Sequence, residues 1–236
     1  MPKPKMILFD AGRTLLDYAS VDTQKGVEAL LSYITENPLN LSAAEIDQRM
    51  NEIAASFDAC KKQLFEVPQR MILALTFDLL RLKFSVDVAE IERILWNEVP
   101  VVVPTPHARE TLDMLNDLGI QTAVISNLDF NGTLLEDRLN ELYPNNQFRF
   151  VIASSDYGIR KPNHHIFEAG IAKSGFRASE IWYVGDKIPV DVNGSSSAGM
   201  IPVLFRCPRN YYMNIPEDLK TIDDLLTLID HVKMES

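Results

Sequence analysis

Short apolar segments alternate with segments of helical periodicity along residues 104–236, and this alternation constrains the fold more than any other feature of the chain. Helical crossovers let successive strands run parallel, and the helices then cover both faces of the sheet. The sequence therefore predicts an α/β fold with a Rossmann-like parallel sheet. Strands are expected at residues 5–10, 121–126, 150–153, 181–184 and 201–205, and helices at residues 106–118, 163–174 and 221–233.

The segment at residues 18–103 has a different texture. It contains no glycine after Gly26, and its apolar residues recur at three- and four-residue spacing, which is typical of helices. Helices are expected at residues 21–35, 42–64, 69–83 and 88–99. We therefore expect residues 1–17 and 104–236 to form the Rossmann-like core domain. Residues 18–103 are expected to form an inserted helical cap domain, with hinges at Leu16–Ala19 and Pro100–Pro104.

Composition excludes several classes of partner. The chain has 23 basic and 33 acidic residues, and it shows no basic stripe of the kind that nucleic-acid binding needs. No apolar run approaches the roughly 18 residues of a membrane-spanning helix. The first apolar run, Ile7 to Phe9, is too short for a signal peptide, and Cys60 and Cys207 form no CxxC pair. These features predict a cytoplasmic protein without nucleic-acid or membrane partners, and they do not predict an oligomeric state.

Polar side chains stand where three of the predicted strands end. Asp10 ends the first strand, Ser126 and Asn127 end the second, and Asp186 follows the strand at residues 181–184. Ligands of open α/β sheets bind at the carboxyl ends of the strands. An aspartate after a strand is usually a turn residue, but three such strand ends together predict one shared site.

Four segments in order give the chain a family resemblance. They are residues 9–17 (FDAGRTLLD), 124–127 (VISN), 158–162 (GIRKP) followed by Ile166-Phe167, and 184–191 (VGDKIPVD) followed by Ala198-Gly199-Met200. Together they resemble the haloacid dehalogenase-like (HAD) superfamily of hydrolases. The helical insert resembles the cap that this family places after its first motif. The resemblance implies hydrolysis of a small phosphorylated molecule.

The resemblance also implies roles for particular residues. Asp10 would be the nucleophile and would form an aspartyl-phosphate, which splits one hard step into two easier ones. Ser126 would hydrogen-bond a phosphoryl oxygen, and Asn127 would help to orient the site. Lys161 would neutralise the charge of the substrate and of the nucleophile.

A magnesium site is implied by the same motifs. Asp10, Asp186 and the main-chain carbonyl of Gly12 would bind Mg²⁺ directly, and Asp191 would sit beside them. Asp191 also lies near the start of a predicted helix, so capping of that helix is a second role for it. The two roles are compatible.

One departure from the family pattern affects the chemistry. Phosphatases of the family carry a second aspartate two residues after the nucleophile, where it acts as general acid and base. Here that position is Gly12, and the next, usually glycine, is Arg13. Gly12 keeps the carbonyl that would bind the metal, but it cannot protonate a leaving group. Arg13 would pair with Asp10 or bind phosphate.

Three functions therefore stay open at this point. The chain is expected to be a phosphatase, with good leaving groups or with another residue as the acid. A phosphonatase-like or dehalogenase-like hydrolase is the second option. Metal-free dehalogenation fits poorly with the acidic pair Asp186 and Asp191, and phosphonatase chemistry needs a cap lysine such as Lys25, Lys61 or Lys62. The third option is a phosphate-binding regulatory module with weak or no turnover.

His164 and His165 follow the third motif at the start of a predicted helix. Neighbouring residues on a helix point in different directions, so we do not expect these two histidines to form a metal site.

Overall fold

A computed structural model describes residues 3–207 and 215–235. Its centre is a six-stranded parallel sheet in the order β10-β9-β8-β1-β6-β7. β1 lies inside the sheet, and its four apolar side chains are fully buried, as expected for a strand covered on both faces. The strands are β1 (Met6–Phe9), β6 (Gln121–Ser126), β7 (Phe148–Ala153), β8 (Ile181–Gly185), β9 (Ile201–Phe205) and β10 (Lys220–Ile222).

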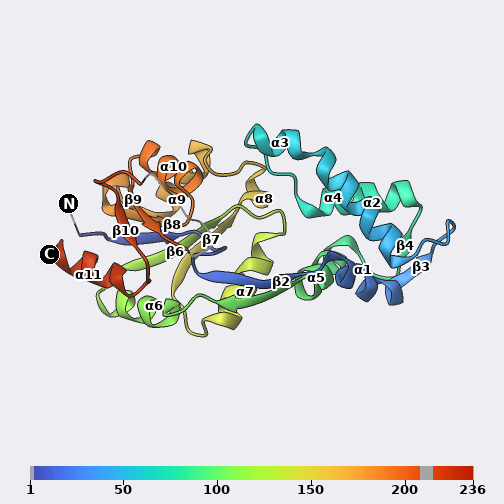
Figure 1. Ribbon diagram of the computed structural model, residues 1–236, viewed down its shortest axis with the longest axis horizontal. Coiled ribbons are helices and arrows are strands. Elements are labelled where there is room, and N and C mark those ends of the chain that lie inside the picture. The colour runs from blue at the N-terminus through green and yellow to red at the C-terminus, as the bar shows by residue number, and fades with distance from the viewer. Residues whose placement is uncertain (1–2, 208–214, 236) are drawn as a thin grey trace.

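Helices cover both faces of this sheet, as Figure 1 shows. On one face, Ile7 of β1 belongs to an apolar cluster that includes Leu115 of α6. On the other face, Leu8 belongs to a cluster with Phe167 of α9. The predicted Rossmann-like α/β fold is confirmed. The helices of this part are α6 (Ala108–Asp117), α7 (Gly132–Leu142), α8 (Ser154–Tyr157), α9 (His164–Ser174), α10 (Asn193–Ser197) and α11 (Thr227–Met234), with a short π-helical turn at Ile188–Val192.

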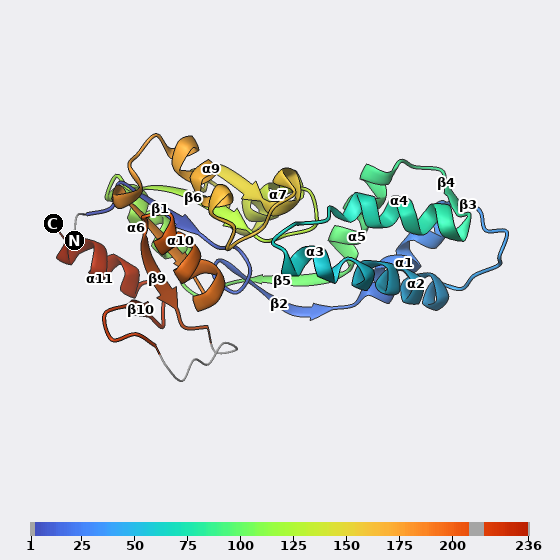
Figure 2. The same cartoon turned by 90° about the horizontal axis from the view of Figure 1, so that it is seen from above.

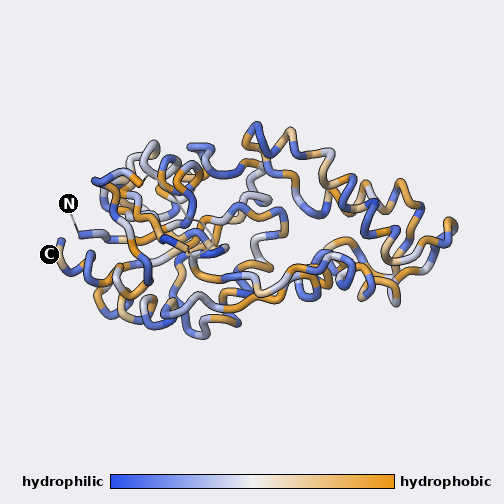
Figure 3. Tube along the Cα trace, in the orientation of Figure 1, coloured by the Kyte–Doolittle hydropathy of each residue, from blue (hydrophilic) through white to orange (hydrophobic). Residues whose placement is uncertain are grey.

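The insert forms a helical unit at the other end of the molecule (Figures 1 and 2). Hydrophobic and hydrophilic residues alternate along its helices, and the apolar positions form a separate core that includes Val27, Met50, Phe77 and Leu95 (Figure 3). Its helices are α1 (Thr23–Leu30), α2 (Ala43–Ser56), α3 (Asp58–Lys62), α4 (Gln69–Leu80) and α5 (Val88–Glu98). Among the helices of the described residues, none has the length and hydrophobicity needed to cross a membrane.

An antiparallel ribbon joins the two parts. β2 (Leu16–Val21) pairs with β5 (Pro100–Pro104), and Tyr18 lies opposite Val102. The two segments predicted as hinges are therefore paired with each other. The predicted borders of the insert, at residues 17/18 and 103/104, fall within this ribbon, and the division into two functional domains stays a prediction.

Three of the predicted helices in the insert are clearly shorter than expected, and the one expected at 69–83 ends at Leu80. The helix expected at 21–35 ends at Leu30, and β3 (Ile34–Glu36) then pairs with β4 (Lys83–Phe84). The chain tightens into a 3₁₀ turn at Leu31–Tyr33 between the helix and this strand pair. The helix expected at 42–64 is divided at Phe57, after Ser56 donates its hydroxyl to the carbonyl of Ile53.

The core differs from the sequence prediction at its edges. The helix expected at 221–233 begins only at Thr227, because residues 220–222 form β10 and pair with β9. The helix expected at 106–118 begins at Ala108. The sequence analysis did not predict α7, in which Leu134, Leu135 and Leu139 are buried. Residues 220–222 form a strand because they pair with β9, and the local periodicity of the sequence does not reveal this pairing.

Candidate active site

The carboxyl ends of β1, β6 and β8 meet as predicted. Asp10 follows β1, Ser126 is the last residue of β6, and Asp186 follows β8. A pocket of about 200 Å³ opens at this edge of the sheet. Its lining residues are Asp10, Gly12, Arg13, Tyr18, Ser126, Asn127, Lys161, Lys187, Val190 and Asp191. The structure thus brings the predicted site residues together, with Asp186 fully buried beside the pocket.

The loop after β1 holds Asp10 in place. The Asp10 amide donates to the carbonyl of Val184 at 2.9 Å, which continues the strand pairing. Beyond it, the amides of Leu15 and Leu16 both donate to the carbonyl of Ala11, and the chain turns sharply. Arg13 has a φ of 63°, a left-handed conformation that glycine adopts far more readily. An arginine therefore stands at a position whose backbone favours glycine.

Lys161 connects the acidic groups of the site. Its Nζ atom lies 2.8 Å from Oδ1 of Asp10, 2.7 Å from Oδ1 of Asp191 and 2.7 Å from the Tyr183 hydroxyl. Lys161 is only 2% exposed, and burial alone would lower its pKa. The carboxylates of Asp10 and Asp191 outweigh that effect and hold the pKa of Lys161 well above its usual value. Lys161 is therefore a fixed cation between two carboxylates.

Asn127 positions the backbone of Lys161. The Lys161 amide donates to Oδ1 of Asn127 at 2.7 Å, and Nδ2 of Asn127 donates to the Lys161 carbonyl at 2.9 Å. Both ends of the Asn127 amide are thus engaged with one backbone. This agrees with an orienting role, although Asn127 also lines the pocket.

Asp10, Asp186 and Asp191 form a buried cluster, in which one carboxylate oxygen from each residue lies within 4.8 Å of the other two. Burial, followed by the charge of Asp10, raises the pKa of Asp186 to about 7. Burial also raises the pKa of Asp191. Asp191 accepts from Lys161 through Oδ1 and from the Lys187 amide through Oδ2 at 3.0 Å. Three carboxylates with one fully buried lysine leave an excess of negative charge, and oxygen donors of this kind fit Mg²⁺.

Tyr18 lines the pocket, and the sequence analysis did not select it. A Cβ atom placed on Gly12 would lie 3.5 Å from both Cε2 and the hydroxyl oxygen of Tyr18. Burial, and next the charge of Asp10, raises the pKa of Tyr18 to about 12. Tyr18 falls in a segment predicted as a hinge, and the pairing of β2 with β5 brings it to the pocket. No motif in the sequence signals this.

The insert touches the core a second time, close to Lys161. The Glu66 amide donates to the Gly158 carbonyl at 3.0 Å, and the Glu66 carboxylate accepts from Ser154 at 2.6 Å and from Arg160 at 3.2 Å. Glu66 is buried, and burial raises its pKa. The segment that carries Lys161 is therefore held from both the core and the insert.

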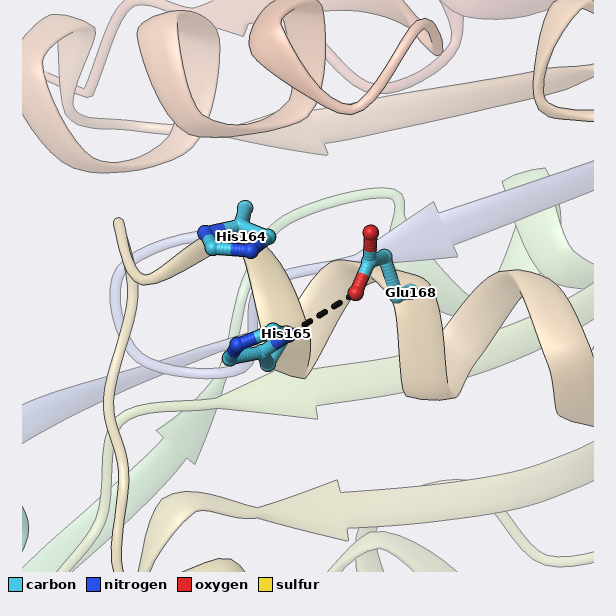
Figure 4. Close-up of side chains that lie close together, drawn as sticks. All are labelled: His164, His165 and Glu168. Atoms are coloured by element: carbon cyan, nitrogen blue, oxygen red, sulfur yellow. Dashed lines mark hydrogen bonds and ion pairs between the residues drawn. The ribbon is translucent and has the colours of Figure 1, made fainter.

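His164 and His165 lie closer together than the sequence argument expected. Their ring centroids are 3.8 Å apart at the start of α9, and His165 Nδ1 lies 2.9 Å from a carboxylate oxygen of Glu168 (Figure 4). The expectation that the two rings point apart is wrong, because His165 turns toward Glu168 one turn later. All three side chains are exposed, and none of them lines the pocket.

Comparison with known proteins agrees with this geometry. The family model described as haloacid dehalogenase-like hydrolase matches residues 7–204. The chain is 28% identical to a glyceraldehyde 3-phosphate phosphatase of Methanocaldococcus jannaschii over 236 residues, which covers 97% of each chain.

Two solved structures share the fold. One is a 2-haloacid dehalogenase from Pseudomonas syringae, with a TM-score of 0.67, 20% identity and coverage of 99% of this chain and 100% of the other. The second is a HAD phosphatase from Thermococcus onnurineus, with a TM-score of 0.62, 21% identity and 97% coverage of both chains. At these identities the likeness concerns the fold.

Proposed function

This chain belongs to the haloacid dehalogenase-like hydrolases, and from that premise we propose that it is a Mg²⁺-dependent phosphatase of small phosphorylated metabolites with Asp10 as its nucleophile. The observation that carries the proposal is the buried set of Asp10, Asp186 and Asp191 around Lys161. It combines a carboxylate nucleophile with a buried cation that neutralises anions and with further carboxylates that suit a metal ion. The Methanocaldococcus jannaschii relative, a glyceraldehyde 3-phosphate phosphatase, also acts on a phosphorylated metabolite.

The reaction follows from the positions of these residues. An Asp10 carboxylate oxygen attacks phosphorus and forms an aspartyl-phosphate, while the bond from phosphorus to the leaving oxygen breaks. Lys161, which already touches Asp10, offsets the negative charge brought by the phosphoryl group. The Ser126 hydroxyl, at the end of β6, is available to donate to a phosphoryl oxygen. Water then attacks phosphorus, releases phosphate and restores Asp10.

The residues present fit a magnesium ion. Asp10 and Asp186 would hold it with the main-chain carbonyl of Gly12, and bound Mg²⁺ would supply positive charge to the phosphoryl oxygens. Both carboxylate oxygens of Asp191 already accept hydrogen bonds, from Lys161 and Lys187. We therefore assign Asp191 to a position beside the metal, where it orients Lys161. Arg13, which lines the same pocket, would add a second cation for the substrate.

The substrate is expected to be small, because the pocket has a volume of about 200 Å³. In the proposed domain division, residues 18–103 act as a cap that excludes water during the reaction. Phosphonatase chemistry is less well supported, since Lys25, Lys61 and Lys62 do not appear among the described residues that line the pocket. Lys25 instead pairs with Glu98 at 3.0 Å.

Phosphate release from para-nitrophenyl phosphate tests the proposal. We expect turnover that needs Mg²⁺ and that Asp10→Asn abolishes. Turnover without Mg²⁺ would contradict the assignment of a metal. Full turnover by Asp10→Asn would contradict the assignment of Asp10 as the nucleophile. No turnover by the wild type on this ester or on a panel of phosphorylated metabolites would favour the phosphate-binding module.

A further inference from the structure

The space beside Gly12 is occupied by Tyr18. The ring edge and the hydroxyl oxygen both lie 3.5 Å from where a Cβ atom of residue 12 would stand. A side chain at position 12 would therefore extend toward the Tyr18 hydroxyl. Tyr18 reaches this place from β2, where it pairs with Val102 of the returning strand β5.

Two other donors of the pocket are already engaged by protein groups, and the proposed function assigns the Ser126 hydroxyl to a phosphoryl oxygen. Lys161 has three partners around Nζ, and the amide of Asn127 is taken up by the backbone of Lys161. The Tyr18 hydroxyl has no hydrogen-bond acceptor among residues 3–207 and 215–235. It is thus available to a bound molecule in the pocket that it lines.

The protonation state of Tyr18 suits a donor. A tyrosine hydroxyl has an ordinary pKa of about 10, so it keeps its proton at neutral pH. A neutral hydroxyl beside a carboxylate nucleophile adds no repulsion. It donates best to an acceptor that gains negative charge.

We propose that the Tyr18 hydroxyl donates a hydrogen bond to the leaving-group oxygen and so occupies the place of the acidic side chain that Gly12 lacks. This inference rests on the proposed phosphatase function. As the bond from phosphorus to the leaving oxygen breaks, that oxygen keeps the electron pair, and the hydrogen bond from Tyr18 stabilises its charge. The departing oxygen then takes its proton from solvent water, and Tyr18 stays neutral throughout.

The consequence is a specific dependence on the leaving group. An alkyl phosphate develops much charge on its departing oxygen, whereas para-nitrophenyl phosphate spreads that charge into its ring. Tyr18→Phe removes only the hydroxyl. We expect kcat/KM for an alkyl ester such as glycerol phosphate to fall about 10- to 100-fold, the usual effect of a lost hydrogen bond to a charged group. The loss should become progressively smaller along a series of esters toward para-nitrophenyl phosphate.

Two further variants sharpen the test. Tyr33→Phe removes a hydroxyl from the insert at a residue outside the pocket lining, and it should not steepen the dependence on the leaving group. Gly12→Asp adds a carboxyl group at the place that Tyr18 serves. It should raise alkyl-ester turnover by a larger factor in Tyr18→Phe than in the wild type. Thermal unfolding of each variant shows whether it is folded.

The outcomes separate this inference from the proposed function. A steeper dependence on the leaving group in Tyr18→Phe supports it. An equal loss on every ester, or no loss, overturns it and leaves the phosphatase function standing. The inference is also overturned if Gly12→Asp raises alkyl-ester turnover by the same factor in Tyr18→Phe as in the wild type. A wild type that turns over no phosphate ester overturns the proposed function itself, and the role of Tyr18 falls with it.

Discussion

Replacement of Lys161 by methionine is expected to destabilise the protein strongly, because it removes the cation from a buried acidic cluster. Nζ lies 2.8 Å from Asp10 and 2.7 Å from Asp191. At an effective dielectric constant of about 20, each contact is worth about 6 kcal/mol of Coulomb attraction. Removing the lysine also removes its own cost of burial, which is several kcal/mol. The net loss expected for a broken buried pair is about 3–5 kcal/mol.

Urea denaturation of the wild type and Lys161→Met without divalent metal measures this loss. A matched control is Lys187→Met. Its Nζ atom lies 3.8 Å from Asp186, and the side chain is 42% exposed, so the expected loss is within about 1 kcal/mol.

The pH dependence of this loss has a definite sign. Burial already raises the pKa of Asp191 and Asp186, and loss of the lysine raises both further. The folded variant then takes up protons that the unfolded chain does not, so the gap to the wild type should narrow as the pH falls from 8 to 5. A loss below about 1 kcal/mol at pH 8, or a gap that widens on acidification, would refute the argument.

Four other predictions concern metal binding, the pH dependence of stability, packing and the contact between insert and core. The pKa of Asp186 is raised from 3.8 to about 7, and a protonated carboxyl group does not bind a metal ion. The Mg²⁺ affinity measured by calorimetry should therefore fall about tenfold per pH unit below pH 7 and become constant above pH 7. Asp186→Asn should remove this dependence on pH. Because that pKa is raised by folding, the metal-free protein should also lose stability as the pH rises from about 4 to about 7. Gly185→Ala places a Cβ atom 2.5 Å from Cγ of Asp191, which should cost about 1–3 kcal/mol in thermal unfolding and reduce turnover; a neutral result would show that Asp191 can shift freely. Glu66→Ala removes the buried carboxylate that accepts from Ser154 and Arg160, and urea denaturation should show a loss of about 1–3 kcal/mol. An unchanged midpoint would mean that this contact does not hold the insert.

Much of the site could be predicted because its residues follow strands that are read from local sequence. Asp10, Ser126 and Asp186 each end a continuous apolar run, and runs of this kind are buried parallel strands. Their convergence then follows from the topology of such sheets. Strand-end reasoning does not place Lys161, which lies between α8 and α9, and only the family resemblance predicted its part in the site.

The missed features depend on contacts between distant parts of the chain. Tyr18 reaches the pocket because β2 pairs with β5, about 80 residues further along, and local periodicity carries no record of that pairing. The Glu66 contact has the same origin, because its partners lie in the core segment before Lys161. The histidine rings were misplaced because helical spacing fixes Cβ directions, whereas the side-chain torsions decide where the rings lie.

The central claim is that Asp10 carries the phosphoryl group, and acid quenching during turnover of para-nitrophenyl phosphate with Mg²⁺ tests it most directly. This ester needs little help in losing its leaving group, whereas attack of water on the aspartyl-phosphate lacks the usual carboxylate base at Gly12. The intermediate should therefore accumulate. Mass spectrometry of the quenched protein is predicted to find one added phosphoryl group on the peptide that contains Asp10, and none in Asp10→Asn. Phosphate release with an unmodified Asp10 peptide at every time point would contradict the account.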